Sequence, residues 1–366
     1  MNNIPNSAIS QAKATLHIAY GHTSHGSQLI AGMGGSGGTG LDTFLTDNPN
    51  YEIPSGLYLW NEGGINGALD LDDYAMGGDV GYYPQWVNNT LNYLGVPDPA
   101  TGRGSLHSNV NVIIWSWCGQ AASRTEATMI STYLAPMTQL EADYPGITFV
   151  YMTGHLDGSG ASGNLHLRNQ QIRQYCRDND KTLYDFADIE SYGPEGLVNY
   201  MELMANDNCD YDNDDNGSRE SNWALAWQSI HDEDIDWWAS GAAHSQHLNG
   251  NLKGFAAWWL WARLAGWSGI DYEIVFTDPD SGGSCNGNGP CYLSIQTALN
   301  ENSDKNCHIK IRQAICDENV VFSGPNYAIL DGGWDEIFSE NSGLSTISGR
   351  LTINGGCLIC SNLIVE

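Results

Sequence analysis

The chain has 366 residues, of which 41% are hydrophobic and 10% aromatic, which predicts a globular protein of about two domains with a substantial core. Only 14 Lys and Arg oppose 43 Asp and Glu, giving a formal net charge of −29. Because this charge repels phosphate groups and anionic lipids, we expect neither nucleic acid nor a membrane surface as a partner.

Alternating strands and helices dominate the first three quarters of the chain. Apolar runs typical of buried parallel strands are followed by stretches with helical periodicity. The strands are predicted at 14–20, 109–117, 147–155 and 182–188, and the helices at 124–141, 164–179 and 250–266. This order predicts an α/β fold, a three-layer sandwich with a mostly parallel sheet, over residues 1–270.

The remainder, 271–366, has a different composition. A linker-like segment at 278–289 leads into short β runs separated by glycine turns, which predict a small all-β or β-helical module. Six cysteines crowd this part, and we expect neighbours to pair as disulfides, with zinc binding beside His308 as the alternative: Cys285 with Cys291, Cys307 with Cys316, and Cys357 with Cys360.

The cysteine usage indicates a secreted protein, either extracellular or periplasmic. No apolar run approaches the roughly 20 residues of a membrane span. The start, MNNIPNSAIS, has no basic region followed by an apolar stretch, so we expect an export signal to have been removed.

Polar segments follow three of the predicted strands: HTSHG at 22–26, CGQ at 118–120 and TGH at 153–155. Because ligands bind outside the carboxyl ends of parallel strands, these segments are expected to converge. HTSHG half-matches the GxSxG elbow, with His22 in place of the first glycine, and makes Ser24 the predicted nucleophile.

A serine after the first strand and a histidine before the last helix resembles the SGNH, or GDSL-type, hydrolase family. The resemblance covers about residues 14–267, and Ser24 matches the serine of the first family block, although Gly-Asp-Ser is here His22-Thr23-Ser24. It implies an oxyanion hole built from Gly78 or Gly81, with Gly63 and Gly64 as weaker choices, and from Gly119 or Gln120.

The fourth family block implies a base at His244 or His247, in AAHSQHLNG, without an acid at the usual place. If His247 is the base, His244 replaces the acid; if His244 is the base, Asp234, Asp236 or a backbone carbonyl orients it. His22 and His155 are predicted to contact the oxyanion or the substrate, or to hydrogen-bond their turns.

No cofactor is expected to be required. The run from Asp210 to Gly217 resembles a calcium loop, with Asp210, Asp212 and Asp214 as ligands of a structural Ca²⁺, and a solvated acidic loop as the alternative. The histidines at 22, 25, 155, 244 and 247 could instead form a zinc site, although no HExxH motif supports one.

These observations predict a secreted serine esterase that cleaves acyl esters, with O-acetyl groups on carbohydrate or small molecules as substrates. One alternative is a non-catalytic binding or structural protein on a hydrolase-like fold. Another is a metal-dependent hydrolase or lyase that uses the histidines. The sequence gives no indication of the oligomeric state.

Overall fold

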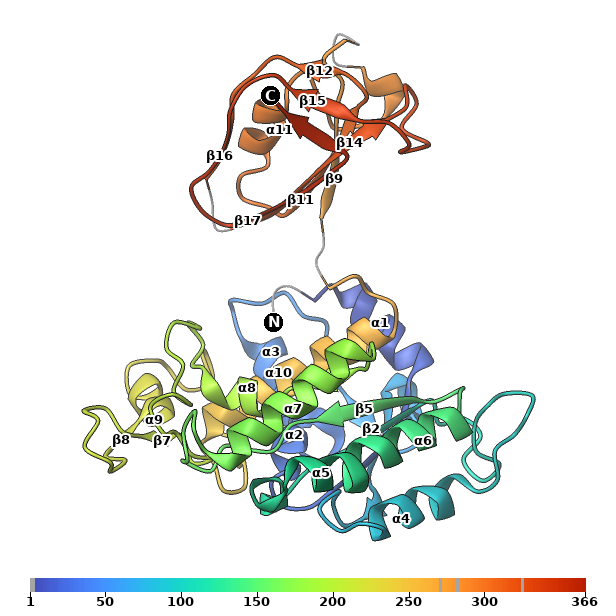
Figure 1. The fold of residues 1–366 in the computed structure, drawn as a ribbon, viewed down its shortest axis with the longest axis vertical. Coiled ribbons are helices and arrows are strands. Elements are labelled where there is room, and N and C mark those ends of the chain that lie inside the picture. The colour runs from blue at the N-terminus through green and yellow to red at the C-terminus, as the bar shows by residue number, and fades with distance from the viewer. Residues whose placement is uncertain (1–3, 270–271, 281–283, 324–325) are drawn as a thin grey trace. The chain divides into compact units, whose positions relative to one another are not determined.

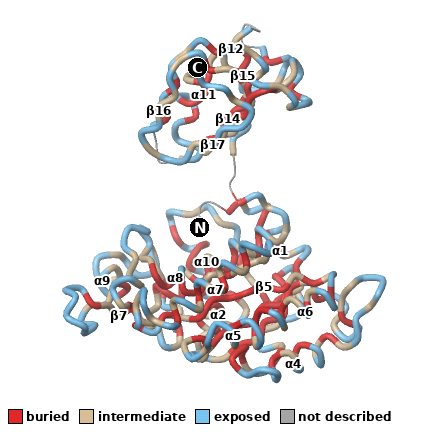
Figure 2. Tube along the Cα trace, viewed as in Figure 1, coloured by how far each residue is buried: buried red, intermediate tan, exposed pale blue. Residues whose placement is uncertain are grey.

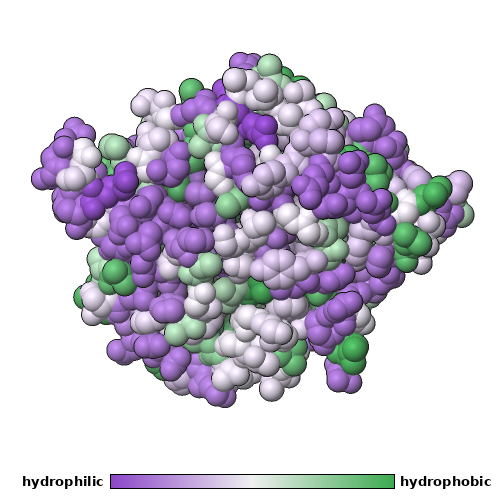
Figure 3. All heavy atoms as spheres, turned by 90° about the horizontal axis from the view of Figure 1, so that it is seen from below, coloured by the Kyte–Doolittle hydropathy of each residue, from purple (hydrophilic) through white to green (hydrophobic). Residues whose placement is uncertain are grey.

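The computed structural model describes residues 4–269, 272–280, 284–323 and 326–366. The chain forms two compact units, Met1–Trp267 and Ser268–Glu366 (Figure 1). No helix in these ranges is long and apolar enough to cross a bilayer. Hydrophilic residues cover most of the face shown in Figure 3, where hydrophobic residues are scattered singly or in small groups.

The large unit contains a parallel sheet of six strands in the order β2-β3-β1-β4-β5-β6. Its strands are β1 (His17–His22), β2 (Trp60–Asn61), β3 (Leu69–Gly77), β4 (Val112–Trp115), β5 (Thr148–Met152) and β6 (Leu183–Tyr184), and a separate antiparallel pair joins β7 (Asp210–Tyr211) to β8 (Ser221–Asn222). The helices are α1 (Asn6–Thr15), α2 (Ser27–Gly32), α3 (Thr39–Asp47), α4 (Gln85–Leu94), α5 (Glu126–Met129), α6 (Ala135–Asp143), α7 (Asn164–Asp178), α8 (Phe186–Ser191), α9 (Trp223–Gln228) and α10 (His247–Leu264).

Alternate residues of each strand face two different cores. Ile18 and Tyr20 of β1 pack in the core that includes α1, α2, α3 and α10, whereas Ala19 belongs to the core that includes α4, α6 and α7. Buried residues follow the sheet and the helix faces turned toward it (Figure 2). The predicted three-layer α/β fold is therefore confirmed.

The predicted helix at 124–141 is interrupted. It consists of α5, a π-helical turn (Ile130–Leu134) and α6, with Pro136 in the first turn of α6. Proline has no N–H to donate to the preceding turn, which accounts for the widened turn at this point.

Two helices of the large unit touch through their backbones. A Cβ added to Gly32 of α2 would lie 1.7 Å from the carbonyl oxygen of Gly250, and one added to Gly254 would lie 1.9 Å from the carbonyl oxygen of Gly32. Only glycine allows so close an approach. As a result, the end of α2 is held against the first turns of α10.

The small unit is β-helical. Strands β9, β11, β14 and β17 pair in parallel, and two further parallel sets, β12-β15-β18 and β13-β16, repeat beside them in chain order. Its elements are β9 (Glu273–Thr277), β10 (Cys291–Tyr292), α11 (Ile295–Glu301), β11 (Cys307–Arg312), β12 (Ile315–Cys316), β13 (Val320–Phe322), β14 (Tyr327–Trp334), β15 (Ser345–Ile347), β16 (Leu351–Ile353), β17 (Cys357–Ser361) and β18 (Leu363–Val365).

One of the three predicted disulfides is present, between Cys285 and Cys291. The other two predicted pairs are wrong, because Cys307, Cys316, Cys357 and Cys360 carry free thiols. Cys357 and Cys360 lie three residues apart on β17, so their side chains point to opposite faces of the strand.

Candidate functional site

The carboxyl ends of β1, β4 and β5 deliver the three polar segments to one edge of the sheet, as parallel pairing requires. Loops from α8 to α9 and from α9 to α10 complete this edge. The residues that meet there include two that the sequence analysis did not assign, Cys118 and Asp207.

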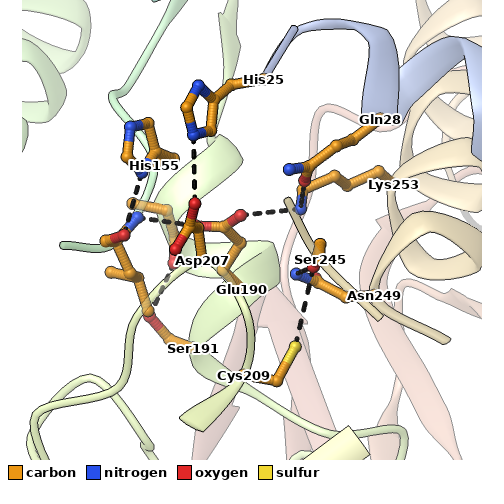
Figure 4. Close-up of polar contacts among 12 residues, drawn as sticks. His25, Gln28, His155, Glu190, Ser191, Asp207, Cys209, Ser245, Asn249 and Lys253 are labelled. Carbon is orange, nitrogen blue, oxygen red and sulfur yellow. Dashed lines mark hydrogen bonds and ion pairs between the residues drawn. The ribbon is translucent and has the colours of Figure 1, made fainter. Parts of the chain in front are cut away.

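His25 contacts two other members of the group. Its Nε2 lies 3.1 Å from Asp207 Oδ2, the contact drawn in Figure 4. Its Nδ1 lies 3.2 Å from Cys118 Sγ. Each of these side chains is half-buried. A thiol, an imidazole and a carboxylate thus form a continuous chain of contacts, the arrangement in which a base activates a nucleophile and is itself oriented by an acid.

The electrostatics stabilise an imidazolium at His25 beside the carboxylate of Asp207, the state that His25 enters when it accepts a proton. Burial acts to lower the pKa of His25, but the hydrogen bonds to Asp207 and Cys118 outweigh it and raise that pKa above 6.5. Burial acts to raise the pKa of Asp207, yet the hydrogen bond from His25 and the nearby ring of His155 bring it below 3.8. Each partner therefore stabilises the ionised form of the other.

The His25 ring is stacked between two other imidazoles. His155 is parallel to it, with ring centroids 3.8 Å apart and an interplanar angle of 1°, and His244 lies at 4.6 Å and 21°. If His155 and His244 both lay on the same face of the His25 ring at these distances, their own rings would overlap. The His25 ring therefore lies between the other two. His244 has a φ of 61°, a strained backbone conformation of the kind found at functional sites.

His155 is fixed by its own neighbour. Its Nδ1 lies 2.9 Å from the carbonyl oxygen of Leu156, which can only accept, so the proton is on Nδ1. Its Nε2 is buried without a hydrogen-bond partner among the described residues and lies 4.0 Å from the Cβ that Gly119 would carry. The second ring nitrogen of His155 is therefore directed toward the residue that follows Cys118.

His25, His155 and Asp207 also have the composition of a metal site, since their ligand atoms lie within 4.8 Å of one another. A metal bound by imidazole lies close to the plane of each ring, at about 2.1 Å from the nitrogen. Stacked parallel rings cannot both meet this condition for one ion. The observed arrangement thus fits acid–base chemistry and does not fit coordination by both histidines.

The predicted catalytic residues are not joined to one another. Ser24 is exposed, and within the described residues its hydroxyl forms no hydrogen bond. His247 opens α10, accepts the amide proton of Gly241 on its Nδ1 at 3.0 Å, and stacks on Trp237. Of the two predicted bases, only His244 reaches the group around His25.

A buried carboxylate organises the residues predicted for the oxyanion hole. Asp79 Oδ1 accepts the amide proton of Gly81 at 2.8 Å, and its Oδ2 accepts from Thr23 at 3.2 Å and from Gln120 at 3.4 Å. The amide of Gly81 is therefore already engaged.

Three other residues were predicted to contact the oxyanion or the substrate. Gly119 opens the short 3₁₀ turn after Cys118, and Gly78 has a φ of 94°. His22 is buried, with its two ring nitrogens against the Thr23 carbonyl at 2.9 Å and Asp73 Oδ1 at 2.6 Å, so it is fully occupied within the fold.

The three predicted calcium ligands do not all lie together. The carboxylates that lie together are Asp212, Asp214 and Glu220, whereas Asp210 accepts hydrogen bonds from Asn208 and Asn222. Asp212 also accepts the amide protons of Asn216 and Gly217. Calcium binding in this loop stays a prediction.

Comparison with known proteins adds little. No family model matches the chain, and no curated protein matches it. A crystal structure from Bacteroides fragilis, named provisionally as an acylhydrolase, is 8% identical, with a TM-score of 0.28 over 50% of this chain and 74% of that one.

Proposed function

We propose that the large unit is an acyl hydrolase that uses Cys118 as nucleophile, His25 as base and Asp207 as the orienting acid. The observation that supports this proposal is the unbroken contact from Cys118 Sγ through both nitrogens of His25 to Asp207, at 3.2 and 3.1 Å. The nucleophile is the thiol in place of the predicted Ser24 hydroxyl, because the thiol is the group in hydrogen-bond reach of a base.

The chemistry follows from these contacts. His25 Nδ1 takes the thiol proton, and the thiolate attacks the acyl carbonyl to give a tetrahedral adduct. The adduct collapses to a thioester on Cys118 when the imidazolium returns its proton to the leaving alkoxide. Water, deprotonated by His25, then attacks the thioester, releasing the carboxylic acid and the thiol. Asp207 stabilises the imidazolium in both steps.

For the substrate, we propose an O-acetyl ester on a carbohydrate or a small molecule. Three tyrosine rings are exposed in this region: Tyr74 within β3, and Tyr82 and Tyr83 in the loop after β3 that carries Asp79. Flat aromatic rings with a polar group at the edge suit contact with sugars. The acidic surface favours a neutral sugar over a sulfated or phosphorylated one. The Cys285–Cys291 disulfide supports a location outside the cytoplasm.

A serine mechanism of the SGNH type remains the second candidate. The exposed Ser24 precedes His25 directly and lies at the carboxyl end of the first strand, as in that family. A rotation of its side chain toward the imidazole on substrate binding would be needed for the same base to serve it.

Two substitutions separate these candidates. With p-nitrophenyl acetate, Cys118→Ala is expected to lower kcat by about 10³-fold or more, because the nucleophile is lost, whereas Ser24→Ala is expected to remain within a few-fold of the parent. Mass spectrometry of acid-quenched enzyme should find an acetyl group on Cys118. The reverse pattern would establish the serine mechanism, and a parent protein inactive on acyl esters would favour the non-catalytic alternative.

A further inference from the structure

The stacked histidines are tied to a buried ion pair on α8 and α10 that the proposed chemistry does not use. Lys253 Nζ lies 2.8 Å from Glu190 Oε1, and both side chains are fully buried. A buried ion pair is a poor source of stability compared with apolar residues of the same size. Stability therefore does not explain why an ion pair occupies this position. The remaining contacts of Lys253 and Glu190 indicate another role.

One set of contacts leads from the ion pair to His155. Glu190 Oε2 accepts the amide proton of Leu156 at 2.6 Å, and the carbonyl oxygen of the same residue accepts the Nδ1 proton of His155. Figure 4 shows this line from Lys253 through Glu190 to the ring beside His25. The carboxylate therefore fixes the peptide that orients the His155 ring.

A second set leads to the opposite face of His25. Lys253 also donates to Gln28 Oε1 in a short contact, and Gln28 Nε2 donates to the carbonyl oxygen of Ala243 at 2.6 Å. Ala243 precedes His244, whose ring covers the other face of His25. A single ammonium group is thus two hydrogen bonds away from the backbone of the residue next to each flanking histidine, Leu156 on one side and Ala243 on the other.

We propose that Lys253, Glu190 and Gln28 are positioning residues that hold His155 and His244 against the two faces of His25. We call this set of five residues the clamp. It prevents the His25 ring from turning about χ2, so that Nδ1 keeps its contact with Cys118 and Nε2 keeps its contact with Asp207. The inference rests on the proposed function for its catalytic meaning, while the clamp itself is open to direct measurement.

Two neutral double variants form a matched pair. Lys253→Met with Glu190→Gln keeps an amide oxygen for the Leu156 amide, and Lys253→Met with Glu190→Leu removes it. Both variants lose the Lys253 contact to Gln28, so they differ only in the Glu190 contact to the Leu156 amide. The first, which keeps that contact, is expected to lose no more than a few-fold in kcat for p-nitrophenyl acetate. The second is expected to lose about 10²-fold with little change in KM, as for a displaced catalytic group. Leu140→Ala, in the core away from the site, controls for lost stability.

A second readout does not depend on activity. In the Glu190→Leu double variant, NMR is expected to show that the ring contact between His25 and His155 is lost and that the His25 titration midpoint falls toward the ordinary value, because the bond to Asp207 loosens. The Glu190→Gln double variant should keep both signals.

Either of two results would overturn the clamp: equal kcat in the two double variants of an active parent, or unchanged His25 signals in the variant that lacks the acceptor. If instead Cys118→Ala is fully active or the parent protein is inactive while the NMR results hold, the proposed function fails and the clamp stands.

Discussion

Removing the ammonium of Lys253 alone should be among the most damaging changes to the large unit. The side chains of Lys253 and Glu190 are fully buried and 2.8 Å apart, so Lys253→Met leaves a carboxylate in the interior with only the Leu156 amide as donor. Losing one partner of such a pair costs about 3–5 kcal/mol. Spread over the 267 residues of this unit, with an unfolding entropy of roughly 2.1 cal/mol/K per residue, the loss lowers Tm by about 5–9 °C.

The assay is thermal unfolding followed by circular dichroism for four proteins: the parent, Lys253→Met, Glu190→Gln and the double variant. The double variant should regain most of the lost stability, because an uncharged amide replaces the unpaired carboxylate. A single Lys253→Met variant that melts within about 2 °C of the parent would refute this reasoning, and so would a double variant no more stable than the single one.

Other predictions concern the site and the small unit. Because the pKa of His25 is raised and that of Asp207 lowered, their pair is most stabilising between those two values. The Tm difference between the parent and Asp207→Asn should therefore be largest near pH 6 and shrink as pH rises through the pKa of His25; a constant difference from pH 6 to 9 would count against a charged pair. EDTA should leave esterase activity unchanged, since the stacked rings do not suit a shared metal ion. If EDTA abolished the activity and added zinc restored it, that view would be reversed. Replacing Cys285 and Cys291 with Ser opens a short loop and should cost the small unit about 2 kcal/mol without changing ester turnover, as measured by its own unfolding transition and the p-nitrophenyl acetate assay.

The sheet was largely predictable from the sequence, because strands buried on both faces are nearly continuous apolar runs. Strands β2 and β3 were the exceptions: β2 has only two residues, and LDLDDYAMG of β3 alternates leucine with aspartate. Asp70 is paired with His17 at 2.6 Å and accepts the amide proton of Gly63. This carboxylate is buried with its partners, which no pattern of hydropathy indicates.

The location of the site was predictable, but its residues were only partly so. The rule that ligands bind at strand ends brought the segments around His25, Cys118 and His155 together. Asp207 comes from a loop with no motif and lies 182 positions from His25, so only tertiary structure joins them. The family order led to Ser24 and to His244 or His247. His244 stacks on His25, whereas the ring of His247 is held by Gly241 and Trp237 at the start of α10.

The backbone contact between α2 and α10 has a consequence for how this protein can change over time. Gly32 and Gly254 leave no room for even a methyl group between the two backbones. A side chain at either position would push α2, which carries Gln28, away from α10, which carries Lys253. Among homologues, these two glycines should therefore vary as little as the reactive residues do, and in a randomised library selected for ester turnover they should be recovered unchanged.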